Sequence, residues 1–301
     1  MKKLLLAISI CATAVAYAQD NAAVAAPQNT GAAATQQAAT VQAQEKSAES
    51  LADLNFGAKA LDRFSAAVSV AYESEYNFRG EHIAGGSIQP QVDLGYDFGA
   101  GFAAYFGYWG SYEIENSGLL DENFNESDIY FGATYTVANF TFDVGAICYM
   151  YPTDAHTAAG DDIHDAEWEW KAAISYDTTD LLGDFNVSPS IAYYYNYTLD
   201  VNTLELGLFY SAPVMKWING DNWLTLDSSV VYGYICAYGG ANRDAGDYSY
   251  FQIKSDVVVS ITDYCSWSFG LRYSLASHNA SEDGRYNPSQ IWFGTGMSFG
   301  F

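Results

Sequence analysis

The residues of this chain that could do chemistry are mostly carboxylates spaced two apart. Glu167, Glu169 and Lys171 stand at alternate positions of one segment, and Lys254 and Asp256 do so in another. Alternate residues of a β-strand share a face, so each run would present its charges to one side of a sheet. Carboxylates lining a pore attract cations and repel anions. Carboxylates that alternate with lysines or arginines can instead plug a narrow barrel as ion pairs, and the sequence leaves both interpretations open.

A set of charged residues shares this alternation and forms the predicted lining of a pore. Its members are Glu73, Glu75, Asp93, Glu113, Asp143, Glu167, Glu169, Lys171, Glu205, Asp227, Lys254, Asp256 and Arg272. Large aromatic residues on the same inward face would constrict such a pore, and they are Tyr105, Trp109, Tyr130, Tyr149, Tyr194 and Trp292. The prediction is therefore a narrow, acidic lumen.

Other chemistries have less support in the sequence. The four histidines, His82, His156, His164 and His278, fall in predicted external loops. The acidic segment 156–165 could ligate a divalent ion, but a solvated acidic loop is the simpler account. A serine nucleophile would need a histidine beside it, and no serine stands in a context that marks it. We therefore predict no enzyme activity, no metal and no cofactor.

Composition narrows the class of protein. The chain has 36 Asp and Glu against 12 Lys and Arg, a net charge of −24 at pH 7. Phosphate binding needs basic patches, so this balance argues against nucleic acid as a partner. The chain also has 25 Tyr and 7 Trp. Both residue types favour membrane interfaces, where one end of the ring is dry and the other wet.

The N-terminal residues predict export. Residues 1–18 have a basic start, an apolar run and an Ala-Tyr-Ala end, as in a cleaved signal peptide. Residues 19–62 are rich in Ala and Gln, and we predict a disordered periplasmic leader with a short helix within 51–61. No later stretch approaches the ~20 apolar residues of a spanning helix.

From residue 63 to 301 the pattern changes to alternation with a period of two, which predicts β-strands with one apolar and one polar face. The segments are 64–79, 87–98, 102–113, 128–137, 140–151, 165–177, 187–197, 203–212, 223–234, 248–261, 265–275 and 290–301. Each is long enough for a tilted strand to cross a bilayer. We therefore expect an all-β fold, a transmembrane antiparallel up-and-down β-barrel of about 12 strands.

Charge placement supports the membrane interpretation. Every charged residue of these segments falls on the polar parity, including Arg79, Asp97, Asp128, Asp165 and Asp177. A basic charge facing lipid at the midplane costs about 2–4 kcal/mol, so a membrane barrel requires this separation. A soluble β-sandwich also alternates, but the signal peptide, strand length and loop pattern favour the barrel.

The connections alternate between tight turns and long polar loops, as in outer-membrane barrels. The pattern is broken at 178–186 and 213–222, which are longer than expected, and at 198–202, which is shorter. Pro90 and Pro189 also lie inside predicted strands, where each removes a ladder donor. Two strands more or fewer would fit at these places.

A family resemblance adds to this interpretation. Tyr76-Asn77-Phe78-Arg79-Gly80, the Asp93–Gly99 run, Tyr108–Ser111 and the stretch from Asp143 to Pro152 resemble the TorF-like family of bacterial outer-membrane porins. The resemblance covers roughly 68–175 and implies an outer-membrane barrel with porin activity but no catalytic residue. The acidic balance and the Ala/Gln leader depart from that family.

Function and partners follow as expectations. We expect a porin-like channel for passive diffusion of small solutes that leans toward cations. The alternative is a closed barrel with a structural, adhesin or receptor role through its external loops. The last strand, from Ile291 to Phe301, alternates aromatic and small residues. It resembles the signal that barrel assembly machinery recognises, so outer-membrane lipid and that machinery are the expected partners.

Overall fold

The computed structural model of the chain describes residues 63–115, 124–152, 166–183, 186–216, 222–237, 247–277 and 289–301. The predicted signal peptide, leader and short helix lie outside these ranges, as do His156, His164 and His278. Within the described ranges no helix is long and apolar enough to cross a membrane.

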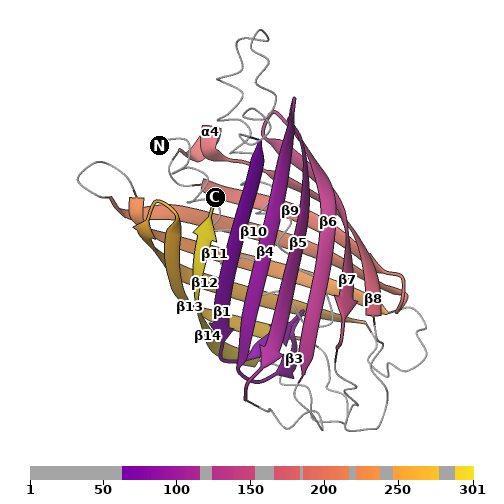
Figure 1. The fold of residues 1–301 in the computed structure, drawn as a ribbon. Coiled ribbons are helices and arrows are strands. Elements are labelled where there is room, and N and C mark those ends of the chain that lie inside the picture. The colour runs from indigo at the N-terminus through magenta and orange to yellow at the C-terminus, as the bar shows by residue number, and fades with distance from the viewer. Residues whose placement is uncertain are drawn as a thin grey trace.

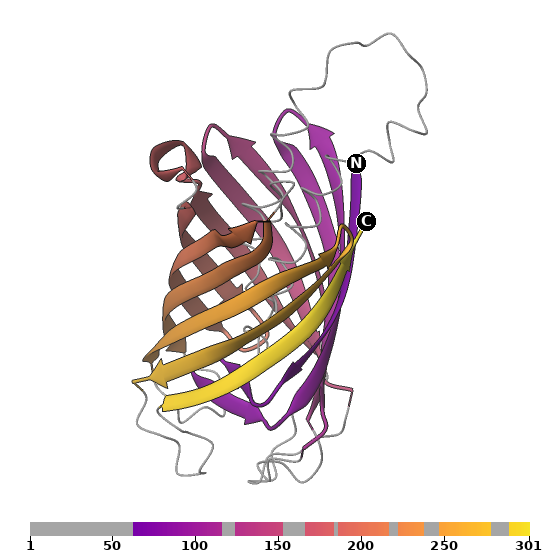
Figure 2. The same cartoon turned by 90° about the vertical axis from the view of Figure 1, so that its left-hand side faces the viewer.

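Twelve antiparallel strands form a closed barrel, which confirms the predicted fold class and strand number. The wall strands are β1 (Phe64–Glu73), β4 (Ser87–Gly99), β5 (Phe102–Glu113), β6 (Asn125–Val137), β7 (Phe140–Met150), β8 (Ala166–Tyr176), β9 (Asn186–Asn196), β10 (Val201–Lys216), β11 (Asn222–Ala237), β12 (Tyr248–Thr262), β13 (Cys265–Ala276) and β14 (Ser289–Gly300). Strand β1 pairs with β4 on one side and with β14 on the other, and this second pairing closes the ring. Figures 1 and 2 show the strongly tilted wall.

The alternation of the sequence decides which side chains face outward. In β8 the residues Glu167, Glu169 and Lys171 are buried inside, while Trp170 and Ile174, on the opposite face of the strand, are 55% and 41% exposed. The same pattern runs through β14. A polar interior with an apolar exterior is the arrangement that lipid demands, so the fold is that of an outer-membrane β-barrel.

The connections lie at two ends of the barrel. Tight turns join β4 to β5 and β6 to β7, where Gly99, Ala100, Gly101 and Ala138 take positive φ. The short helix α4 (Thr179–Leu182) lies at the same end (Figure 1). The connection expected at 213–222 is shorter than predicted, because β10 continues to Lys216 and leaves only residues 217–221 before β11, whereas the connection after β8 contains α4.

Both strand prolines lie where a ladder is interrupted on one side. Pro90 is opposite Val70 in β1, and its register with β5 is skipped. Pro189 is opposite Leu208 in β10, beyond the last pair between β8 and β9. Each missing N–H is therefore accommodated without loss of a strand.

The first predicted strand is wrong at its end. It was expected over 64–79, but β1 stops at Glu73, which pairs with Gly294 and with Ser87. The chain then forms a two-stranded hairpin, β2 (Tyr76–Phe78) and β3 (Glu81–Ala84), which we call the lumen hairpin (residues 76–84). Its strands pair only with each other, and Figure 1 shows β3 at the end of the barrel opposite α4.

The turn of the lumen hairpin explains the departure. Arg79 and Gly80 have φ of 44° and 88°. Positive φ at both central residues is the type I′ turn, whose twist matches a tight hairpin. A Cβ at Gly80 would lie 2.8 Å from the Cβ atoms of Tyr250 and Ala276, so the tip fits against β12 and β13 only without a side chain.

Candidate functional site in the barrel lumen

The aromatic side of the lumen hairpin packs against the inner wall. Tyr76 and Phe78 are buried in one apolar cluster with Trp109 of β5 and Tyr149 of β7. The rings of Tyr76 and Trp109 lie 5.7 Å apart. These contacts fill the lumen beside β5–β7, where the sequence predicted constricting aromatic residues.

The tip of the lumen hairpin reaches the opposite wall. Arg79 donates two hydrogen bonds to the carboxylate of Glu169 in β8, at 2.9 and 3.0 Å, and its Nε lies 3.5 Å from Glu205 in β10. Its guanidinium also lies 4.7 Å from the ring centre of Tyr194 in β9. Strand β9 is six strands from β1 in either direction around the ring, so Arg79 spans the barrel.

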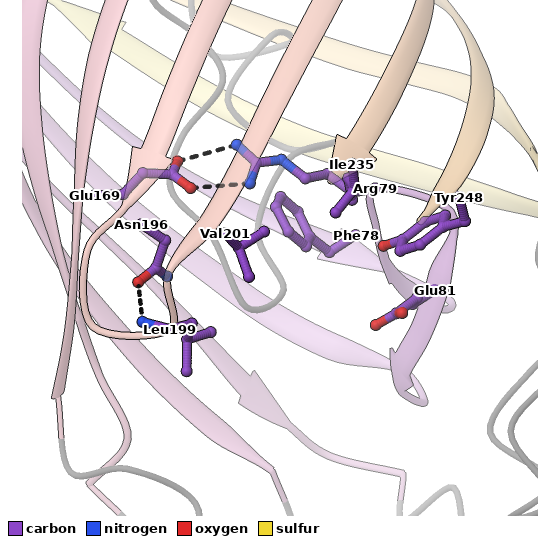
Figure 3. A pocket seen from close by; sticks show the side chains of 9 residues that line it. All are labelled: Phe78, Arg79, Glu81, Glu169, Asn196, Leu199, Val201, Ile235 and Tyr248. Atoms are coloured by element: carbon purple, nitrogen blue, oxygen red, sulfur yellow. Dashed lines mark hydrogen bonds and ion pairs between the residues drawn. The ribbon is translucent and has the colours of Figure 1, made fainter. Parts of the chain in front are cut away.

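Figure 3 shows this contact and the small cavity beside it. The cavity is lined by Phe78, Arg79, Glu81, Glu169, Asn196, Leu199, Val201, Ile235 and Tyr248. Burial lowers the pKa of the Arg79 guanidinium, but Glu169, Tyr250 and Glu205 outweigh it and hold that pKa well above its usual value. Arg79 is therefore a permanent cation inside the barrel.

The other cations of the lumen are also paired with carboxylates. Arg272 donates to Asp256 at 2.7 Å and to Glu73 at 3.1 Å. Lys254 lies 3.4 Å from Asp256. These ion pairs, together with that of Lys171 with Asp143, lie on strands from β7 round to β1, and we call β7–β13 the paired wall. Among its described carboxylates, Asp143, Glu169, Glu205 and Asp256 have cationic partners.

A second region of the wall is different. Strands β4–β6 contain no Lys or Arg, and we call them the cation-free wall. Asp93 accepts from Tyr130 and Gln91, and no described Lys or Arg is paired with it. Glu126 and Asp128 follow each other on the inner face of β6, both fully buried. Glu126 accepts a 2.6 Å hydrogen bond from Tyr76, and no ion pair to either carboxylate is formed by a described cation.

The remaining predicted lining residues have local partners. Glu113 accepts from the backbone N–H of Gly85 at 2.9 Å and of Phe124 at 2.7 Å, so it fastens the base of the lumen hairpin. Glu167 accepts from Asn196 and Asp227 from Ser211. Glu75 lies outside the wall, in the connection after β1, against His82.

Sequence reasoning missed two residues. Glu126 lies on the inward parity two positions before Asp128, but the predicted segment began at 128. Extending the alternation would have found it. Arg79 was placed on the wall, and only the Arg-Gly pair, which suits a tight turn, signals otherwise. Within the described ranges, no group of three His, Cys, Asp or Glu residues has the geometry of a metal site.

Several solved structures are similar to this chain. LpxR from Salmonella typhimurium has 9% identity and a TM-score of 0.48, over 78% of this chain and 99% of that one. An outer membrane channel from Pseudomonas putida F1 has 11% identity and a TM-score of 0.48, over 79% and 95%. The NanC porin has 12% identity and a TM-score of 0.44, over 78% and 98%.

No curated protein sequence matches the chain. A family model, described as a bacterial protein of unknown function (Gcw_chp), matches residues 57–277. This match extends over most of the sequence, from before β1 to the end of β13. The chain therefore belongs to the Gcw_chp family.

Proposed function

We propose that this barrel is an outer-membrane channel for passive diffusion of small solutes that prefers cations. The observation that carries the proposal is the charge of the lumen. Among described residues, ten buried carboxylates face four buried cations. A lumen with excess carboxylate attracts cations and repels anions.

The placement of this excess supports the proposal. On the paired wall the cations neutralise their partners, whereas Asp93, Glu126 and Asp128 on the cation-free wall have no described cation beside them. The lining that we propose is therefore the predicted set without Glu75, with Glu126 and Asp128 added as two buried carboxylates that no described cation neutralises.

Water in the lumen is a second line of support. Several buried inward polar atoms have no hydrogen-bond partner among the described residues, and they include atoms of Asn77, Gln89, Ser111 and Asp128. Buried polar groups are costly unless they are hydrogen-bonded, and water is the usual partner where protein supplies none. The TorF-like resemblance of the Tyr76–Gly80 region points to the same function.

Export and assembly belong to the same proposal. A cleaved signal peptide over 1–18 would deliver the chain, and assembly machinery would recognise the strand that ends at Phe301. In the structure β14 seals the barrel by pairing with β1, from Ala67 opposite Gly300 to Glu73 opposite Gly294. A terminal strand that completes the ring is suited to that role.

A closed barrel with a structural, adhesin or receptor role is the second candidate. The lumen hairpin favours it, because Arg79 crosses the lumen and ties to Glu169. Planar-bilayer recording separates the two, since a folded barrel without channel events would contradict the channel. The hairpin bears on the regulation of a channel as well, which the next subsection develops.

Charge substitution tests cation preference directly. We expect Glu126→Gln with Asp128→Asn to move the permeability ratio of K⁺ to Cl⁻ toward one, measured as reversal potential in a salt gradient. Asp180→Asn is the matched control, because Asp180 is an exposed acid of α4. An unchanged ratio in the double variant, or an anion preference in the wild type, would refute the cation-selective lining.

A further inference from the structure

The lumen hairpin is a separate unit of structure inside the barrel. Its strands make no described backbone hydrogen bond to the wall, whereas each wall strand pairs along two neighbours. Only its base is joined to the wall. Ser74 N–H donates to Phe293 C=O at 2.9 Å, and Gly86 C=O accepts from Ile114 N–H at 2.8 Å. Between these points, the nine residues of the lumen hairpin are held across the lumen by side chains.

The polar contacts that hold the tip converge on one residue. Arg79 is the hairpin residue that joins Glu169, Glu205 and Tyr194 on the paired wall. At the other side of the hairpin, Tyr76 bonds to Glu126 on the cation-free wall. The hairpin thus bridges the two walls, and the described ion pairs that hold it to the far wall are those of Arg79, beside the packing of Gly80 against Tyr250 and Ala276.

This bridge crosses the lumen at the level of the hairpin, and the contact at its tip is dry. The side chain of Arg79 is 3% exposed, and those of Glu169 and Tyr194 are each 1% exposed. Water has almost no access to the charges where they meet, so no continuous aqueous path passes through this contact.

We propose that the lumen hairpin is a gate, latched shut by Arg79 and opened by movement of residues 76–84 away from the paired wall. The proposal rests on the channel function given above and names its regulation. Opening leaves the wall intact, because Glu73 already pairs with Ser87 and with Gly294 without help from the hairpin.

The backbone of the tip is consistent with a device that has two positions. Arg79 is a non-glycine residue with φ of 44°, a conformation that L side chains adopt at a cost and that the surrounding contacts must maintain. When the latch separates, Arg79, Glu169 and Glu205 pass from a dry contact into a polar lumen. Hydration there replaces the partners that each charge loses.

The first test removes the latch and keeps the hairpin. Arg79→Asn introduces an Asn-Gly pair, the commonest sequence for a type I′ turn, so the hairpin retains its turn while the guanidinium is lost. We expect single-channel open probability to rise about tenfold or more, because loss of one partner of a buried ion pair shifts a two-state equilibrium at least that far. Arg63→Asn is the control, since exposed Arg63 bonds to Phe98 C=O outside the lumen.

The second test removes the gate. Deleting residues 75–85 joins Ser74 to Gly86 and leaves a two-residue turn between the partners Glu73 and Ser87, the commonest hairpin length. We expect a channel that stays open, with conductance raised about twofold or more because the barrel bore is no longer crossed. Heat-modifiable migration and far-UV circular dichroism establish that each variant is a folded barrel.

The outcomes separate the gate from the channel. Openings in the wild type that become more frequent with Arg79→Asn, and constant in the deletion, support both. If the wild type conducts and the folded variants conduct identically, the gate is overturned and the channel stands. If wild type, Arg79→Asn and the deletion are all folded and silent, the channel itself is overturned and the gate with it.

Discussion

The cation-free wall and the paired wall share one barrel but handle buried charge in opposite ways. On the paired wall, Asp143 meets Lys171 and Asp256 meets Arg272. On the cation-free wall, Glu126 accepts a hydrogen bond from Tyr76 and lies on the same inner face as Asp128, and no described cation is paired with either carboxylate. On the paired wall, ion pairs link neighbouring strands. On the cation-free wall, no described cation is paired with the carboxylates.

This difference teaches that a count of inward carboxylates does not measure selectivity. A buried carboxylate tied to a guanidinium contributes little net field, and its removal strands the partner. A buried carboxylate without a cation is destabilising in its charged form, and burial favours its neutral form. The same substitution should therefore cost much more stability on the paired wall than on the cation-free wall.

The largest effect is expected on the paired wall. Lys171→Met removes the ammonium group and leaves the carboxylate of Asp143 buried without its ion-pair partner, which costs about 3–5 kcal/mol in the free energy of unfolding. Urea unfolding of the barrel in detergent micelles, followed by tryptophan fluorescence, measures this cost.

The control for this prediction is the double variant Lys171→Met with Asp143→Leu. Replacing a buried pair by apolar residues of similar size is often neutral, so most of the lost stability should return. A double variant as unstable as Lys171→Met alone would show that Lys171 stabilises the wall by packing and not by charge.

The first strand shows what the sequence predicts and what it does not: the alternation of faces is predicted, but the end of the strand is not. Polar residues continue at alternate positions through Glu73, Glu75, Asn77 and Arg79, so period alone extends the strand across all of them. The structure ends the strand where its partners end, at Glu73 opposite Gly294. The register between β1 and β14 depends on residues that are 219 or more positions apart in the sequence. The local pattern of either strand alone does not determine it.

In the lumen, too, the sequence predicts which side chains face inward but not which of them pair. Parity places Glu169 and Lys171 inside the barrel, because a charge facing lipid is costly wherever the strand lies. Parity does not say that Arg79, 90 residues before Glu169, is its partner. Which charged residues pair depends on the width of the barrel and on the lumen hairpin that follows β1. The absence of Lys and Arg from β4–β6, however, is visible in the sequence and foretells the cation-free wall.

An intermediate effect is expected where the lumen hairpin meets the cation-free wall. Tyr76→Phe keeps the ring against Trp109 but removes the hydroxyl that donates to Glu126 at 2.6 Å. A hydrogen bond to a charged group contributes about 1.5–3 kcal/mol, so unfolding should become easier by that order. Tyr112→Phe is the control, because its hydroxyl bonds on the outer face to Tyr108. Equal losses in the two variants would mean that Glu126 is not held by the hairpin.

The smallest effect, and the sharpest comparison, comes from one substitution made on both walls. Asp93→Asn keeps the oxygen that accepts from Tyr130, replaces the oxygen that accepts from Gln91 with an amide nitrogen, and strands no described cation, so the free energy of unfolding should fall by only about 1 kcal/mol. Asp143→Asn makes the same chemical change but leaves Lys171 buried without its counter-charge, which costs about 3 kcal/mol. Both are measured by urea unfolding under one condition. Equal losses would erase the distinction between the walls, because the carboxylate charge would then be stabilising whether or not a cation faces it.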